Sequence, residues 1–271
     1  MLLLVDAGNT RIKWALAAEG SAAGDPATGD PAAGGPAPGD WLAHGAVLHA
    51  ELERLPAAWL GHGITRAIVS NVAGPAMRAE LDALLAQLTP PLQAEWFVSQ
   101  PELAGLRNRY RNPGQLGSDR FAAALGARTL APGRALVVAT CGTATTVDAV
   151  SADGDFIGGM ILPGVGLMLG ALARGTAQLP QVAAAQSASS LPATFADNTE
   201  DAILSGCLSA QAGAIERACA AHRAELCIVS GGAAGHVAPL LSVAHRLLDN
   251  IVLVGLHAAA SAASTMRNPP C

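Results

Sequence analysis

Two short stretches, one near the start of the chain and one at its middle, decide the fold. Residues 6–14 read D-A-G-N-T-R-I-K-W, and residues 142–148 read G-T-A-T-T-V-D. Each lies at the end of a short apolar run typical of a buried strand, and each leads into a segment with the character of a second strand. The sequence therefore predicts a strand, a tight turn and a second strand at both places.

Both turns have the composition of a phosphate-binding site. Glycine lets the backbone approach a ligand closely, and consecutive amides in a tight turn suit a phosphate. Asn9 and Thr10 add short hydrogen-bonding side chains, and Asp6 stands at the strand end, where it is placed to hold a hydrated Mg²⁺. Ordinary hairpin turns use the same residues, but two such motifs in corresponding places favour phosphate binding.

The rest of the chain alternates between strands and helices in two similar cycles. The first cycle predicts strands over residues 1–6, 11–17, 41–48, 67–70 and 95–98, and helices over 75–88 and 118–130. The second predicts strands over 135–139, 144–150, 156–162 and 226–229, and helices over 164–173 and 200–222, with two shorter elements after them. We therefore expect a duplicated α/β fold with halves at 1–130 and 131–263 and a frayed tail at 264–271.

A low-complexity segment interrupts the first half. Residues 20–40 contain only Gly, Ala, Pro, Asp, Ser and Thr, and GDPA occurs twice. Because the segment has no large apolar side chain to bury, we expect a flexible insertion between two strands.

Composition excludes several classes of protein. The 271 residues carry a net charge of −5 and no run of Lys or Arg, which argues against nucleic-acid binding. The five cysteines are odd in number and form no C-x-x-C pair, so a disulfide framework or zinc site is not expected and a reducing compartment fits. No signal peptide or membrane-length apolar run is present, which predicts a cytoplasmic protein without a membrane partner.

A polar loop before the helix expected at 118–130 holds the other candidate site residues. It reads Y-R-N-P-G-Q-L-G-S-D-R over residues 110–120, and Asp119 and Arg120 lie where the helix begins. A helix N-terminus and a guanidinium together favour an anion. The alternatives are an acid that interacts with the helix dipole and an arginine on the solvated surface. Two other nucleotide motifs are absent or incomplete: there is no P-loop, and glycines 164, 166 and 170 miss the dinucleotide spacing.

Taken together, these stretches resemble a known family. Paired glycine-rich hairpins in related halves are similar to the superfamily of acetate and sugar kinases, heat-shock ATPases and actin. Within it, the chain resembles type III pantothenate kinases, some of which are labelled Bvg accessory factor. The matching stretches also include G-G-M-I-L-P-G at 158–164, N-T-E-D-A-I at 198–203 and S-G-G-A-A at 230–234.

The resemblance implies a fold, a reaction and a set of site residues. It implies a duplicated ribonuclease H-like fold, ATP- and Mg²⁺-dependent phosphorylation of pantothenate to 4'-phosphopantothenate, and a homodimer with Thr199 near the partner's substrate loop. Asp119 corresponds to the proton acceptor. The implied phosphate-binding residues are Asp6, Ala7, Gly8, Asn9, Thr10, Arg11, Ile12, Lys13, Gly142 and Thr143. The implied substrate-binding residues are Tyr110, Gly117, Ser118, Asp119, Arg120 and Thr199.

The chain departs from the family at one position of the second hairpin. The family usually has an aspartate there that binds a monovalent cation, K⁺ or NH₄⁺, and this chain has Thr140. A direct cation site near Thr140 is therefore doubtful. Two other functions stay open: a kinase of another small acid or sugar, and a non-enzymatic regulatory protein on a kinase fold.

Overall fold

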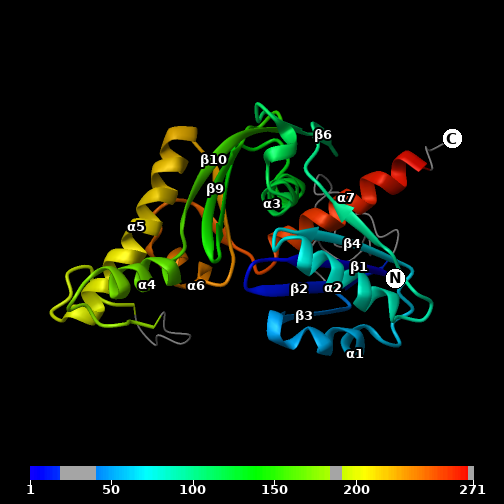
Figure 1. The fold of residues 1–271 in the computed structure, drawn as a ribbon. Coiled ribbons are helices and arrows are strands. Elements are labelled where there is room, and N and C mark those ends of the chain that lie inside the picture. Colours follow the sequence, from blue (N-terminus) through cyan, green and yellow to red (C-terminus); the bar gives the residue numbers. More distant parts are fainter. Residues whose placement is uncertain (19–40, 184–190, 268–271) are drawn as a thin grey trace. The chain divides into compact units, whose positions relative to one another are not determined.

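The chain folds into two compact units. A computed structural model describes residues 1–18, 41–183 and 191–267. The first unit comprises Met1–Gly133, Gly154–Phe156 and the segment from Asn250 on, and the second comprises Arg134–Asp153 and Ile157–Asp249 (Figure 1). The insertion expected at residues 20–40 lies outside the described residues.

The first unit is built on a mixed five-stranded sheet in the order β3-β2-β1-β4-β5. Its strands are β1 (Leu2–Ala7), β2 (Arg11–Ala17), β3 (Ala43–Leu48), β4 (Arg66–Asn71) and β5 (Ala94–Phe97). β2 is antiparallel to β1 and β3, whereas β4 is parallel to β1 and β5. Two short strands follow, β6 (Glu102–Leu103) and β7 (Leu106–Asn108), which form a hairpin.

Helices cover both faces of this sheet. They are η1 (His49–Arg54), α1 (Leu55–Trp59), α2 (Pro75–Ala86), η2 (Pro113–Gln115), α3 (Ser118–Leu130) and α7 (Ile251–Arg267). Leu3, Val5 and Ala7 of β1 share a core cluster with side chains of α1 and α2. Because successive side chains of a strand point to opposite faces, Leu4 and Asp6 face the other way, toward the side where α3 and α7 pack.

The second unit repeats the strand order of the first. Its strands are β8 (Leu136–Cys141), β9 (Ala144–Val150), β10 (Asp155–Pro163), β11 (Leu226–Ser230) and β12 (His245–Leu247). They lie in the order β10-β9-β8-β11-β12, with β8 antiparallel to β9 and parallel to β11. The first two residues of β10, Asp155 and Phe156, belong to the first unit and pair with β7.

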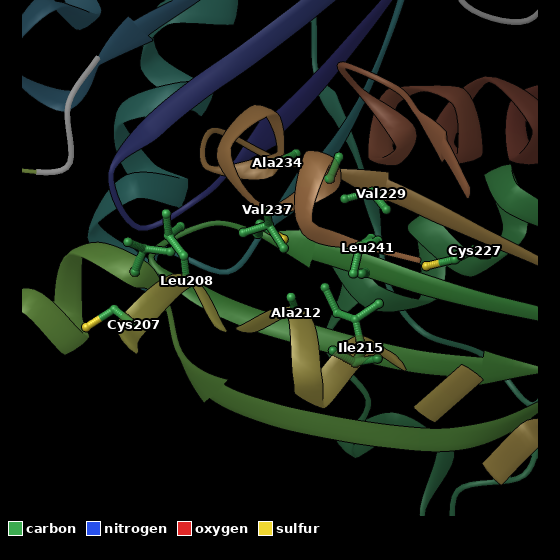
Figure 2. Close-up of a cluster of buried hydrophobic side chains, with 14 of the residues drawn as sticks. Cys207, Leu208, Ala212, Ile215, Cys227, Val229, Ala234, Val237 and Leu241 are labelled. Atoms are coloured by element: carbon green, nitrogen blue, oxygen red, sulfur yellow. The ribbon is translucent and has the colours of Figure 1, made fainter. Parts of the chain in front are cut away.

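The core of the second unit lies between its sheet and its helices α4 (Val165–Gly175), α5 (Thr199–His222), α6 (Ala234–Val237) and η3 (Ala238–Leu240). Figure 2 shows part of this core, in which Leu208, Ala212 and Ile215 of α5 lie near side chains of β11 and α6. The described cysteines, Cys141, Cys207, Cys219 and Cys227, are all free and buried. Among the described residues, no helix is both long and apolar enough to cross a membrane.

The duplicated α/β fold expected from the sequence is confirmed, and most strands and helices lie where the pattern predicts them. The last helix differs. α7 runs from Ile251 to Arg267, where two short elements and fraying from residue 264 are expected. Residues 251–260 are buried all along their length, so this part of the helix presents no polar face to solvent. It also packs in the first unit, although its residues follow those of the second.

Candidate active site

The first hairpin joins β1 to β2 through Gly8, Asn9 and Thr10. Asp6 pairs with Lys13, and the Gly8 N–H donates to the Arg11 carbonyl oxygen at 3.2 Å. Asn9, Thr10 and Arg11 are exposed, so their side chains are accessible to a ligand. The side chains of Ala7 and Ile12 are fully buried in the core. These two residues therefore offer only backbone groups to a ligand.

Asp6 lies beside the beginning of α3. Its partner on β4 is Ser70, whose hydroxyl lies 2.8 Å from the hydroxyl of Ser118, the first residue of α3. This contact brings Asp119, the next residue, close to Asp6. Burial raises the pKa of Asp6 to about 7, an effect that Lys13 opposes and the Asp119 carboxylate reinforces. The structure therefore places two mutually repelling acids at one end of the first sheet.

The carboxylate of Asp119 is held in place by its own helix. Its Oδ1 atom accepts a hydrogen bond from the Arg120 N–H at 2.8 Å. A Cβ atom at Gly117, the N-cap of α3, would lie 2.6 Å from this Oδ1, so glycine leaves room for the carboxylate in this orientation. Burial raises the pKa of Asp119, and the hydrogen bond from the Arg120 amide opposes the rise. The carboxylate is thus both oriented and more basic than an exposed one.

Arg120 is buried rather than solvated, which excludes the surface alternative for this residue. Its side chain is 7% exposed, and Nη1 donates to the Tyr110 hydroxyl at 2.8 Å. The guanidinium also lies over the rings of Tyr110 and Phe156, at 5.6 Å and 5.9 Å from their centroids. A buried guanidinium with aromatic neighbours is a strong site for a carboxylate.

The loop that carries Tyr110 is organised by Asn108, a residue that the sequence analysis did not single out. The Asn108 amide donates to the Ser99 hydroxyl and to the Pro113 carbonyl, and its Oδ1 accepts from the Tyr110 N–H. Ser70 was missed in the same way. Ser70 acts through Ser118, which is 48 residues away in the sequence. The partners of Asn108 lie only 2 to 9 residues away, but they meet it only once the loop has folded.

The second hairpin joins β8 to β9 through Gly142 and Thr143. The Gly142 N–H donates to the Ala144 carbonyl at 3.0 Å. The Gly164 N–H donates to the Thr143 carbonyl at 3.0 Å, and a Cβ at Gly164 would lie 2.6 Å from that oxygen. Gly164 is the N-cap of α4, so the N-terminus of this helix lies directly against the hairpin.

The turn after β11 contacts the same hairpin from another side. Gly231 has a φ of +101°, and a Cβ there would lie 2.5 Å from the Cys141 carbonyl oxygen. That oxygen accepts the Ala233 N–H at 3.0 Å. Three glycine segments of the second unit, at 142, 164 and 231, are therefore packed together, as a backbone-lined nucleotide site requires.

Thr140 is a weak candidate for a cation ligand. Its hydroxyl oxygen is buried and has no hydrogen-bond partner among the described residues. Asp148, the acid nearest in the sequence, is 1% exposed within β9. Among the described residues, no three His, Cys, Asp or Glu side chains form a metal-binding group.

The remaining predicted site residue, Thr199, belongs to the second unit. It is the exposed first residue of α5, whose N-cap is Asn198. Tyr110, Gly117, Ser118, Asp119 and Arg120 all belong to the first unit with Asp6. The first unit thus brings together the acids and the substrate loop, and the second brings together the glycine turns.

Two ribonuclease H-like sheets with the same strand order, each with a glycine hairpin, define the fold of the actin-like ATPases and sugar kinases. Solved structures agree on this fold. A protein from Campylobacter jejuni described as a Baf family transcriptional activator superposes with a TM-score of 0.59 at 18% identity, covering 98% of both chains. A 2-dehydro-3-deoxygalactonokinase-like protein from Sinorhizobium meliloti gives 0.54 at 17% identity, covering 100% of both.

Sequence comparison is more specific than the fold. The family model of type III pantothenate kinases matches residues 2–221. A type III pantothenate kinase from Herminiimonas arsenicoxydans is 54% identical over 266 residues, which cover 96% of this chain and 97% of the relative. One from Janthinobacterium sp. (strain Marseille) is 57% identical over 268 residues, with the same coverage. The chain belongs to the type III pantothenate kinase family.

Proposed function

We propose that this protein transfers the γ-phosphoryl group of ATP to pantothenate, the first step of coenzyme A biosynthesis. Family membership over nearly the whole chain supports the reaction. The observation that carries the proposal at the site is the position of Asp119, an oriented carboxylate next to Asp6 and the first hairpin. This pairing supports a base at Asp119 beside a phosphate site at the first hairpin.

Asp119 is the proposed base. It takes the proton of the primary hydroxyl of pantothenate as that oxygen bonds to the γ-phosphorus, and the bond from phosphorus to the β–γ bridging oxygen breaks to release ADP. Phosphoryl transfer passes through a loose transition state, so orientation of the hydroxyl matters more than a strong base. The hydrogen bond from the Arg120 N–H supports this role because it fixes the direction of the carboxylate.

The nucleotide-binding residues are proposed as the resemblance implies them. Asp6 to Lys13 offer backbone and side-chain groups, and Gly142 and Thr143 offer backbone groups. Oxygen ligands suit Mg²⁺, and Asp6 would hold the ion through water; bound with ATP, Mg²⁺ neutralises charge on the phosphates. The close packing of Gly164 and Gly231 on the second hairpin supports adenosine binding near that turn.

Pantothenate is proposed to bind beside α3. Its carboxylate suits the buried Arg120 guanidinium, whose contact with the Tyr110 hydroxyl limits its movement. Gly117 and Ser118 are proposed to line the approach to Asp119, and Thr199 is proposed, as the resemblance implies, to lie close to the substrate loop of the partner in a homodimer. A carboxylate partner for Arg120 favours a small acid over a neutral sugar as the substrate.

Two further proposals concern the monovalent cation and the assembly of the chain. We propose that K⁺ or NH₄⁺ binds weakly or not at all, since Thr140 offers a hydroxyl and no charge. We propose that the chain forms a homodimer; exposed apolar side chains on the second unit, such as Ile161 at 64% and Leu167 at 45%, support an apolar contact. Sedimentation that finds a stable, fully active monomer would contradict the dimer.

A coupled assay of ADP release tests the proposed reaction. The purified protein with MgATP is expected to release ADP when pantothenate is added and to release little without it. Replacing pantothenate by glucose or by a short hydroxy acid is the specificity control. Equal release with every acceptor, or none with pantothenate, would overturn the function.

A further inference from the structure

His49 contacts the tip of the first hairpin from a neighbouring element. Its Nε2 atom lies 2.8 Å from the Gly8 carbonyl oxygen, and its side chain is half-buried. A carbonyl oxygen can only accept a hydrogen bond, so Nε2 carries the hydrogen and His49 is the donor. The family resemblance assigns no role to this residue.

Strand pairing explains why His49 stands at this place. β3 runs antiparallel to β2, with Leu48 opposite Arg11, so the chain that leaves β3 passes alongside the turn. The Leu48 N–H donates to Oε2 of Glu51 at 3.2 Å, which fixes the start of η1. His49, the first residue of η1, is thereby held against Gly8.

The contact determines the direction of one peptide group. The peptide between Gly8 and Asn9 is trans, so its C=O and N–H point in opposite directions. With the Gly8 C=O held by His49, the Asn9 N–H is directed away from His49. The Gly8 N–H is already bonded to Arg11, whereas the Asn9 N–H has no partner among the described residues. A free, oriented amide in a turn suits a phosphate oxygen.

We propose that His49 is a positioning residue for the phosphates of ATP: its hydrogen bond to Gly8 holds the Asn9 N–H in the direction that a phosphate oxygen needs. The inference rests on the proposed role of the first hairpin as a phosphate site. It adds a residue outside the hairpin, 41 positions along the chain from Gly8, to the nucleotide site.

The test compares two replacements of His49. His49→Phe keeps a ring of similar size and loses the donor, whereas His49→Gln keeps an N–H near the position of Nε2. His44→Phe makes the same chemical change on an exposed residue of β3 and is the matched control. The readouts are kcat and the KM values for ATP and for pantothenate, with ADP affinity from titration calorimetry.

Loss of the hydrogen bond should raise the KM for ATP and the Kd of ADP by about 3- to 10-fold. The KM for pantothenate should stay at the wild-type value, His49→Gln should restore most of the nucleotide affinity, and His44→Phe should change nothing. Unchanged nucleotide constants in His49→Phe would overturn the proposal, as would an equal loss in His49→Gln. If His49→Phe does not fold, His49→Asn, whose amide is too short to reach Gly8, provides the same test.

Asp6→Asn, measured in the same assays, separates this inference from the proposed site. Impaired use of ATP in Asp6→Asn together with normal constants in His49→Phe would refute the role of His49 alone. Normal constants in both variants would show that the first hairpin does not bind the phosphates, which would refute the proposed site as well.

Discussion

The two hairpins have the same backbone plan and different chemistry. Asp6 pairs with Lys13 on one side and Ser70 on the other, and Thr140 pairs in the same manner with Thr146 and Ser230. Asp6 and Thr140 are therefore equivalent positions of the duplicated fold. At this position, the first hairpin carries the Asp6 carboxylate opposite the cationic side chain of Lys13. The second hairpin carries the neutral hydroxyl of Thr140 opposite the hydroxyl of Thr146.

The two hairpins are also supported differently. A side chain, His49, contacts the first turn, whereas backbone packing at Gly164 and Gly231 supports the second. Gln211 of α5 supports the second hairpin indirectly. Its fully buried amide donates to the carbonyl of Pro163, the residue before Gly164, at 2.7 Å. The first unit thus carries the charged groups of the candidate site, and the second carries a closely packed, neutral backbone surface.

The largest expected effect comes from removing the proposed base. Asp119→Asn keeps the shape of the side chain and loses its charge, and kcat for pantothenate phosphorylation should fall about 10²–10⁴-fold, the usual contribution of a positioned base. ADP affinity should stay near the wild-type value. A helix-terminal role alone would lower stability by about 0.5–2 kcal/mol and leave turnover intact, so steady-state kinetics combined with urea unfolding separates the two.

Asp6→Asn should produce a smaller and different loss. Because the proposed role of Asp6 is to hold Mg²⁺ through water, both the KM for MgATP and kcat should suffer, and raising the Mg²⁺ concentration should recover part of the rate. Kinetics at several Mg²⁺ concentrations measure this. A defect in kcat alone, independent of Mg²⁺, would indicate that Asp6 acts on pantothenate instead.

Gly164→Ala should disturb the second hairpin specifically. The new Cβ would overlap the Thr143 carbonyl, and overpacking of this kind costs about 1–3 kcal/mol. We expect a lower free energy of unfolding and a higher KM for ATP. Gly166→Ala is the matched control, since a Cβ there meets nothing within 4 Å. Equal effects of the two substitutions would show that helix propensity, not contact with the hairpin, is responsible.

Placing an acid at Thr140, the position equivalent to Asp6, tests the cation site. The wild-type rate should change by less than about 2-fold between Na⁺ and K⁺ or NH₄⁺ buffers, because a neutral hydroxyl holds a cation weakly. Thr140→Asp should introduce a dependence on K⁺ or NH₄⁺, seen in initial rates at varied salt. Tight activation of the wild-type protein at low millimolar K⁺ would mean that another group binds the cation.

The smallest effect concerns the stability of the first unit at low pH. His257 of α7 is 7% exposed and stacks edge-on against Trp41, and burial lowers its pKa from the ordinary value of 6.5. Below pH 6.5 the unfolded chain takes up a proton that the folded chain does not, so the free energy of unfolding should fall as the pH falls. Above pH 7.5 this contribution should be constant.

Urea unfolding at pH 5.5, 6.5 and 7.5 measures the effect. His257→Gln should show a weaker dependence on pH than the wild-type protein over this range. If the two proteins lose stability in parallel between pH 7.5 and 5.5, other groups are responsible.

The candidate site was predictable to the extent that it is local in sequence. Asp6 to Thr10 span the end of an apolar strand and the turn after it, and Gly117 to Arg120 span the N-cap and first residues of a helix, so a strand end and a helix start marked them. Their proximity was implied only by resemblance, because it depends on the contact between Ser70 and Ser118. His49 and Gln211 carry no local signal, since each is defined by a backbone group 41 or 48 residues away along the chain. The partners of Asn108 depend on how its own loop folds.

By itself, the sequence determined the two strand–turn–strand units, the duplication and the family, because apolar runs and glycine turns are properties of consecutive residues. Tertiary structure decided the burial of Arg120, the raised pKa of Asp6 and the return of α7 to the first unit. These depend on residues that are distant along the chain and adjacent in space. Desolvation and packing act between such neighbours, and a linear pattern does not specify which neighbours meet.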